Sequence, residues 1–255
     1  WLDYLTESFR ATNNGQDPSN LKELLTAWSL PDTVNQYISD GKWVDWVDQT
    51  LNTGIQQNYS ISVSGGTEKT QGYFSLGYNS TQGIYKNDRA RLYTLRAGVT
   101  NKVAKWITAG VQTGLSWKDN DQRSSRINKT FQTVPLGDVY DENGNINAHP
   151  IAGTSVVSLL ADDIPNTYEN NSKNINLTIN PYIELNLATG LTFKSIVGAT
   201  LRSGRAGIFN SDHTYMMLVG SEAARRYSSY STTMGYGYIW ENIANYNKTI
   251  AGDHS

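Results

Sequence analysis

The feature that most constrains this chain is a strict alternation of aliphatic and polar side chains. Between residues 175 and 187, Ile or Leu occupies every second position except 181, and Asn, Thr or Glu fill most positions between. Because successive side chains of a strand point to opposite faces, the pattern predicts a long strand with one aliphatic and one polar face. Pro181 interrupts the pattern and predicts a bulge or a local gap in strand pairing.

The same alternation recurs along the chain and predicts seven strands of about 9 to 17 residues, longer than the 5 to 6 residues typical of globular sheets. The six further segments that carry the alternation are residues 59–64, 74–78, 93–99, 107–117, 191–202 and 234–250, and the predicted strands extend from them to the connections on either side. The connections between strands alternate in length. The short ones are residues 66–70, 101–105 and 188–190, and the long ones are 80–89, 119–173 and 204–233.

Tight turns at one end of a sheet and long loops at the other are typical of outer-membrane barrels, whose periplasmic turns are short. Every predicted strand also reaches about 9 residues, the length that crosses a bilayer when tilted. We therefore predict an all-β fold, an antiparallel up-and-down transmembrane β-barrel, with the aliphatic face toward lipid and the polar face toward the lumen. Seven strands do not close an even-numbered barrel, so we expect a piece of a larger one.

The alternation of turns and loops places residues 1–54 outside the cell as an extracellular loop, and residues 55–255 as partial barrel. In the loop, Leu21, Leu24, Leu25 and Trp28 have helical spacing, with Asp17 and Pro18 as a predicted N-cap and first turn. Leu2, Leu5 and Phe9 predict a second short helix.

Composition excludes several classes of protein. The charged fraction is 17%, below the roughly 25% of an average domain, and aromatic residues reach 11%. A net charge of -2 gives no electrostatic footprint for nucleic acid, and the absence of Cys excludes disulfides and thiolate metal sites. No apolar run is long enough for a membrane-spanning helix and no secretory signal is visible, so we expect a mature or truncated chain.

No pattern predicts catalysis, a metal or a cofactor, and we expect no enzyme. His149, His213 and His254 are far apart in loops or turns. Asp141, Asn143 and Asn145 have the spacing of a calcium loop, but Ile146 follows where that loop needs Gly, so turn formation is the better interpretation.

The aromatic residues predict two kinds of site. Aromatic rings near strand ends are typical of the membrane interface, and we assign Tyr78, Trp106, Trp117 and Tyr236 to it. Loop tyrosines are candidates for contact with a substrate or a lid protein, although they also suit packing of the loops on themselves. These candidates are Tyr140, Tyr168, Tyr215, Tyr227 and Tyr230.

Several segments together resemble the SusC/RagA-like TonB-dependent transporters. The most specific is the block Ser-Gly-Gly-Thr-Glu-Lys-Thr at residues 64–70, which follows the strand 57–63. The resemblance continues, in the order of the family, through residues 73–78, 82–84, 91–96, 105–107, 140–145, 190–194, 240–242 and 246–249.

The resemblance implies a barrel of about 22 strands with a plug inside it. It also implies an outer-membrane location in a Gram-negative bacterium, a SusD-like surface lipoprotein as partner, and import of glycans or peptides driven by the TonB complex through the plug. This chain contains neither plug nor later strands, so by itself it would not couple transport.

Two other classes compete with this interpretation. A soluble all-β carbohydrate-binding or adhesin-like protein would seal the aliphatic faces of two sheets against each other. A β-rich glycoside hydrolase needs two carboxylates about 5 to 10 Å apart, and the adjacent Asp162 and Asp163 would diverge on a strand.

Overall fold

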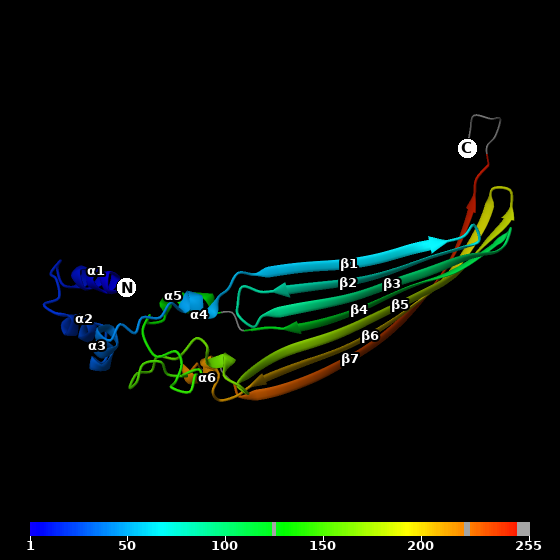
Figure 1. Ribbon diagram of the computed structural model, residues 1–255. Helices are drawn as coiled ribbons and strands as arrows, with labels where there is room; N and C mark the ends of the chain where they lie inside the picture. The colour runs from blue at the N-terminus through cyan, green and yellow to red at the C-terminus, as the bar shows by residue number, and fades with distance from the viewer. Residues whose placement is uncertain (124–125, 222–224, 249–255) are drawn as a thin grey trace.

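The computed structural model describes residues 1–123, 126–221 and 225–248, which form one long curved sheet with helices and loops gathered at one end (Figure 1). The seven strands are β1 (Ile55–Gly66), β2 (Thr70–Gln82), β3 (Arg89–Ala104), β4 (Ile107–Asp121), β5 (Tyr168–Ala188), β6 (Leu191–Asn210) and β7 (Tyr227–Tyr246).

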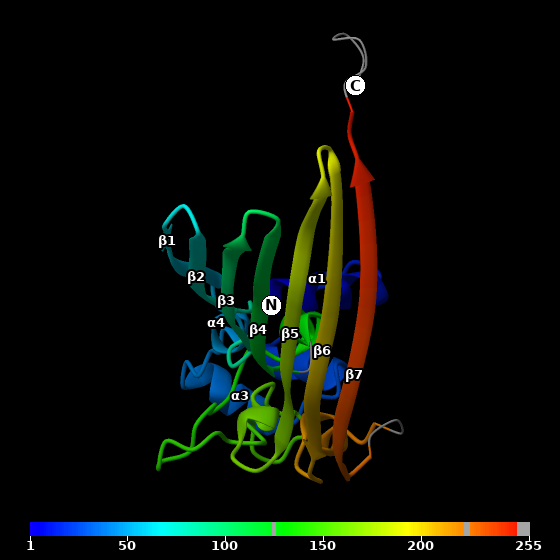
Figure 2. The same ribbon diagram turned by 90° about the vertical axis from the view of Figure 1, so that its right-hand side faces the viewer.

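Every strand pairs antiparallel with its neighbours in sequence, in the order β1 to β7. One row of paired residues crosses all seven strands on the aliphatic face, and it consists of Ile61, Leu76, Leu95, Leu115, Leu177, Leu201 and Tyr236. Figure 2 shows the sheet twisted and bent around one side, with free edges at β1 and β7. The predicted fold class, a partial up-and-down transmembrane barrel, is confirmed.

The strands are longer than the alternation predicts, mainly at the end with the long loops. β5 begins at Tyr168 and β7 begins at Tyr227, in polar segments rich in Asn and Ser that carry no alternating pattern. The three loops at this end therefore shrink to residues 83–88, 122–167 and 211–226. The predicted end of the last strand at Ile250 and the turn at residues 252–255 lie outside the described residues.

Pro181 produces a gap in pairing, the second of the two outcomes expected. Pro181 pairs with Val111 of β4, but the β5–β6 ladder skips from Ile179 to Tyr182 with no change of register. Proline has no N–H to donate, so this point of the ladder toward β6 is left open.

The N-terminal segment holds four helices, α1 (Leu2–Thr12), α2 (Leu21–Ala27), α3 (Asp32–Ser39) and α4 (Trp46–Thr50). The first two confirm the predicted helices, but the predicted N-cap of α2 is wrong. The Asn20 side chain caps α2 by accepting from the Glu23 N–H at 2.9 Å, whereas Asp17 pairs with Arg10. Asparagine directly before the first helical turn is a stronger cap than an aspartate three residues earlier.

The buried apolar residues all lie in helices and loops, not in the sheet. Leu25, Val34, Leu136 and Ile151 form one cluster, for example, and each is at most 2% exposed. On the aliphatic face of the sheet, by contrast, Ile61 and Val63 are 70% and 65% exposed.

Throughout the described ranges no second sheet covers this aliphatic face, so the alternative of a soluble sandwich is wrong for these residues. Three short helical segments complete the fold: α5 (Ile127–Gln132), the 3-10 turn η1 (Ala161–Asp163) and α6 (Tyr215–Leu218). Among the described helices, none has the length and apolar character to cross a membrane.

Candidate functional site

The long loops at one end of the sheet form one packed assembly with the N-terminal helices. The segment that precedes α4 pairs with the β4–β5 loop, because the Val44 N–H donates to the Pro135 carbonyl at 3.0 Å and Trp43 forms a bridge with Leu136. The Trp46 indole N–H donates to the Val134 carbonyl at 2.8 Å. Two segments almost ninety positions apart in sequence are thus held together by backbone and side-chain bonds.

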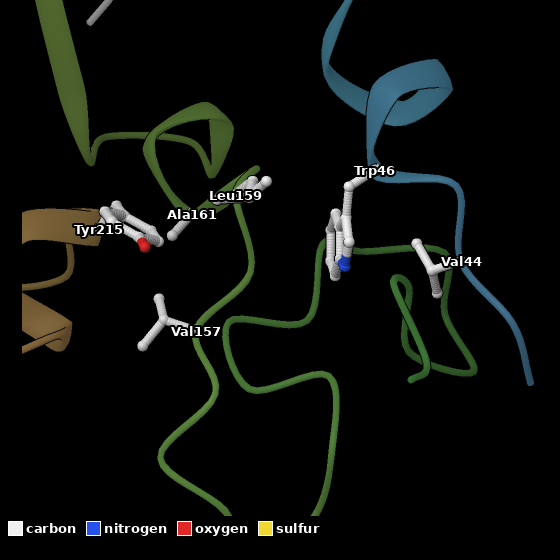
Figure 3. Packing of buried hydrophobic residues seen from close by; sticks show 6 residues of the cluster. All are labelled: Val44, Trp46, Val157, Leu159, Ala161 and Tyr215. Carbon is white, nitrogen blue, oxygen red and sulfur yellow. The ribbon is translucent and has the colours of Figure 1, made fainter. Parts of the chain in front are cut away.

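A third segment, the β6–β7 loop, joins this assembly through Tyr215. Figure 3 shows Tyr215 directed toward Ala161 and Val157, with Trp46 and Val44 entering from the N-terminal segment. Tyr215 is 6% exposed and Ala161 is fully buried. The apolar cluster therefore joins the N-terminal segment with the β4–β5 and β6–β7 loops.

An ion pair between Arg126 and Asp162 is buried beside this cluster, with side chains 11% and 6% exposed. Asp162 also accepts the Tyr215 backbone N–H at 2.8 Å, and the Arg126 guanidinium lies 4.7 Å from the centre of the Tyr215 ring. Burial raises the pKa of Tyr215, while the charge of Arg126 acts in the opposite direction. Among the described residues, only the Arg126 Nε is buried without a hydrogen-bond partner.

A second group of charges joins the β2–β3 hairpin loop to the β4–β5 loop. Arg123 pairs with Asp163 at 3.3 Å, and its backbone N–H donates to Asp88. The Asn87 amide donates to Asp163 at 3.0 Å. Burial raises the pKa of Asp163 and of Asp88, against the lowering effect of these hydrogen bonds and of Arg123.

The five tyrosines proposed as contact residues are not all in loops. Tyr140 is a loop residue, 49% exposed, with its hydroxyl 3.5 Å from the Gln49 side chain. Tyr215 is also in a loop but is buried in the cluster described above. The other three, Tyr168, Tyr227 and Tyr230, belong to strands, which is a correction of their predicted loop position.

The strand tyrosines divide between the two faces of the sheet. Tyr168 and Tyr227 share one row, both paired with Asn210, and both have the parity of the polar face. Tyr230 pairs with Gly207, has the parity of the aliphatic face and is 67% exposed. The structure therefore brings Tyr168 and Tyr227 together, at the mouth of the polar face, and separates them from Tyr230.

On the aliphatic face, four aromatic side chains form a continuous row across β1 to β4, which we call the aromatic row. Tyr59 lies 6.3 Å from Tyr78, Tyr78 lies 5.0 Å from Tyr93, and Tyr93 lies 5.1 Å from Trp117, measured between ring centres. Tyr78 and Trp117 were named from the sequence, whereas Tyr59 and Tyr93 were missed. Pairing the segments around residues 80–89 as a hairpin would have placed Tyr93 opposite Tyr78.

The other two interface candidates lie elsewhere. Trp106 occupies the tight turn between β3 and β4, is 54% exposed, and accepts the Asn186 N–H at 2.9 Å through its carbonyl. Tyr236 lies at the middle of β7 and not near its end, because that strand begins at Tyr227.

The segment after Tyr140 is a turn, as predicted. Asp141 accepts the N–H groups of Asn143 and Asn145 at 2.9 and 2.8 Å, and Gly144 has φ +81°. Hydrogen bonds from Asn145 lower the pKa of Asp141. His149 and His213 are exposed loop residues, and His254 lies outside the described residues. No group of three metal-ligating side chains occurs in the described parts of the chain.

Comparisons with known proteins agree with this architecture, although no protein-family profile matches the chain. The TonB-dependent receptors P3, P39 and P26 of Formosa agariphila are 24%, 27% and 22% identical over 86%, 83% and 82% of this chain. The chain spans 23%, 20% and 21% of their lengths, about a fifth of each.

Solved structures of the RagAB peptide importer have the same fold. Its "open-open" state matches 98% of this chain and 30% of the solved chain, with a TM-score of 0.70 and 16% identity. The "closed-closed" state matches 83% of this chain and 26% of the solved chain, with a TM-score of 0.58 and 17% identity.

The sheet, its one-sided loops and the exposed aliphatic face define a segment of an antiparallel transmembrane β-barrel. The resemblance drawn from the sequence is confirmed: the chain is similar in sequence to TonB-dependent receptors, and it shares its fold with the RagAB structures. The relatives are receptors and transporters by name, in keeping with a protein that is not an enzyme.

Proposed function

We propose that this chain is part of a transporter that imports nutrients across the outer membrane of a Gram-negative bacterium, driven by TonB. The single observation that carries the proposal is the exposed aliphatic face, which crosses all seven strands beneath a packed assembly of loops. Exposed apolar area of this extent on a sheet needs an apolar surrounding, which the lipid of a membrane provides along the whole wall of a barrel. The relatives and the shared fold support the same class.

In this proposal residues 1–54 form an external loop, and the chain from residue 55 onward contributes barrel strands and loops. The polar face lines the lumen, where Tyr168 and Tyr227 stand at the mouth. Tyr140, exposed on the assembly of loops, is proposed to meet the substrate or a SusD-like surface lipoprotein. Tyr78, Trp106, Trp117 and Tyr236 are proposed to lie in contact with the lipid or its headgroups.

The proposed substrates are oligomeric nutrients, either peptides or oligosaccharides. Stacking of aromatic rings suits the apolar face of a sugar ring, and a wide barrel mouth admits a chain of either kind. The neighbours of the same fold are named peptide importers, which supports peptides as the first class to test.

The function is tested with the full-length protein. We expect it to require detergent for solubility and to migrate as a heat-modifiable barrel. A deletion strain should lose growth on one nutrient class, assayed separately with peptide mixtures and with oligosaccharides as sole carbon source. Solubility without detergent, or unchanged growth and uptake of both classes in the deletion strain, would contradict the proposal.

A further inference from the structure

At the end of the sheet that carries the long loops, the aliphatic face bears a band of charged side chains. Elsewhere on this face the described strands carry no charged residue. Two residues beyond the aromatic row, each strand carries a charged or polar residue of the same parity. The outer charged band consists of Arg91, Asp119, Lys173 and Arg205 at this level, together with Arg89 and Asp121 two residues further out. These residues line a polar cavity of about 790 Å³ that also includes Tyr230 and Glu169.

Two of the acidic residues in the band are already neutralised. Asp121 pairs with Arg89 at 2.5 Å, and Asp119 pairs with Lys173 at 3.3 Å. Within the described ranges, Arg91 and Arg205 have no ion-pair partner. The band therefore holds four cations and two carboxylates, and both carboxylates form their ion pairs with cations other than Arg91 and Arg205.

The register also places like charges side by side. Lys173 and Arg205 are directly opposite each other on β5 and β6, an unfavourable arrangement of like charges in which Lys173 is paired with Asp119 but Arg205 has no ion-pair partner among the described residues. Arg91 is opposite Asp119, which lies between Arg91 and Lys173 in the same row. This row of the sheet therefore holds three cations and one carboxylate.

We infer that the outer charged band binds the phosphate groups of anionic lipid headgroups in the outer leaflet. The inference rests on the proposed function, since it requires the aliphatic face to meet lipid. The acyl chains would then lie against the aromatic row and the aliphatic residues below it, which form an apolar surface continuous with the band. Guanidinium groups bind phosphate through paired N–H donors, and Tyr230 adds a hydroxyl donor at the same site.

The test uses the full-length protein in detergent, with diphosphorylated lipid A as the probe and binding measured by native mass spectrometry. The variant R91Q/R205Q removes the two unpaired charges and breaks no ion pair. The matched control is R96Q/R202Q, because Arg96 and Arg202 lie on the same two strands but on the polar face, and neither has an ion-pair partner among the described residues.

We expect R91Q/R205Q to bind lipid A roughly 30-fold more weakly, since each cation at a membrane surface contributes about a factor of 5. R96Q/R202Q should keep wild-type affinity to within about threefold, and R91K/R205K, which keeps the charge but loses the paired N–H donors, should bind more tightly than R91Q/R205Q and more weakly than the wild type. Heat-modifiable migration shows separately that the barrel of each variant has folded. If the wild-type protein itself does not migrate in this way, the result counts against the proposed function and not against this lipid site.

Two results would overturn the inference. One is an equal affinity for lipid A in the wild type, R91Q/R205Q and R96Q/R202Q. The other is binding of inorganic pyrophosphate that depends on Arg91 and Arg205 and is not displaced by lipid A, which would assign the band to a free anion. Phosphatidylethanolamine, which has no net charge, should bind all four proteins alike.

Discussion

Arg126 and Asp162 form a buried ion pair between two parts of the β4–β5 loop, and Asp162 in addition holds the first residue of α6 through the Tyr215 N–H. A single carboxylate thus connects the β4–β5 loop with the β6–β7 loop. Because Asp162 lies beside the cluster of Val157, Ala161 and Tyr215, we expect the ordered packing of the loops to depend on this carboxylate.

Replacing this carboxylate should loosen the external loops while the sheet stays intact. In D162A the buried Arg126 loses its partner, which typically costs about 3 to 5 kcal/mol. We expect faster hydrogen exchange in residues 126–133, 157–164 and 214–218, with the strands unchanged. The control D141A removes an exposed turn carboxylate and should change exchange only near residues 141–145. Unchanged exchange in all three segments of D162A would show that the ion pair does not order the loops.

The buried carboxylates should make the loop assembly more stable as the pH falls. A raised pKa means that folded Asp163 binds a proton more readily than unfolded Asp163, so stability increases from neutral pH down toward the ordinary value of 3.8. The free energy of local opening, measured by hydrogen exchange between pH 7 and pH 4, is expected to rise. In D163N this part of the pH dependence should disappear. A slope of the opposite sign would contradict the burial argument.

The aromatic row should contribute to stability through contact between its rings. Tyr93 touches both Tyr78 and Trp117, at 5.0 and 5.1 Å. A double-mutant cycle of Y93A and W117A, measured by urea unfolding in lipid vesicles, should give a coupling energy of about 0.5 to 1.5 kcal/mol. Tyr59 and Trp117, separated by two strands, serve as the control pair with no expected coupling. Equal coupling in both pairs would remove the case for direct ring contact.

Glycine at position 110 makes room for Tyr182 on the polar face. A Cβ atom there would lie 2.6 Å from the ring, which is held by a 2.8 Å hydrogen bond between its hydroxyl and Thr100. G110A should therefore displace the ring and cost about 1 to 3 kcal/mol, seen as a lower temperature for loss of the heat-modifiable form. In G72A the new Cβ meets only the Gly98 carbonyl, at 3.6 Å, so its unfolding temperature should stay near that of the wild type. A similar shift in both variants would point to a general effect of adding a side chain to the sheet.

The sequence predicted the barrel strands well where one face is aliphatic. Residues 175–187 alternate because one parity is apolar throughout, and the structure places them in one strand. Residues 168–174 continue the same strand without any apolar parity, since this end of the sheet carries polar and charged residues on both faces. Alternation does not reveal a strand whose two faces are both polar, so the predicted strands are shorter than the observed ones.

The candidate site was less accessible to sequence analysis because it depends on contacts between distant segments. Asp162 and Asp163 appeared only as adjacent loop carboxylates, and nothing in the sequence links them to Arg126 or Arg123. Tyr215 was selected as a loop aromatic, yet the packing of Val157 and Ala161 against it decides that it is buried. The outer charged band likewise emerges only when the register aligns residues of different strands.

The most direct test of the account asks which face of the sheet meets lipid. The 255-residue sequence contains no Cys, so once any Cys elsewhere in the full-length protein is replaced by Ser, single Val111→Cys and Gln112→Cys variants carry a fluorescent label at neighbouring positions of β4. In vesicles of brominated lipid, the label at position 111 should be strongly quenched and the label at position 112 should not. Strong quenching at position 112 with none at position 111, or equal quenching at both, would contradict the assignment of the aliphatic face to the membrane.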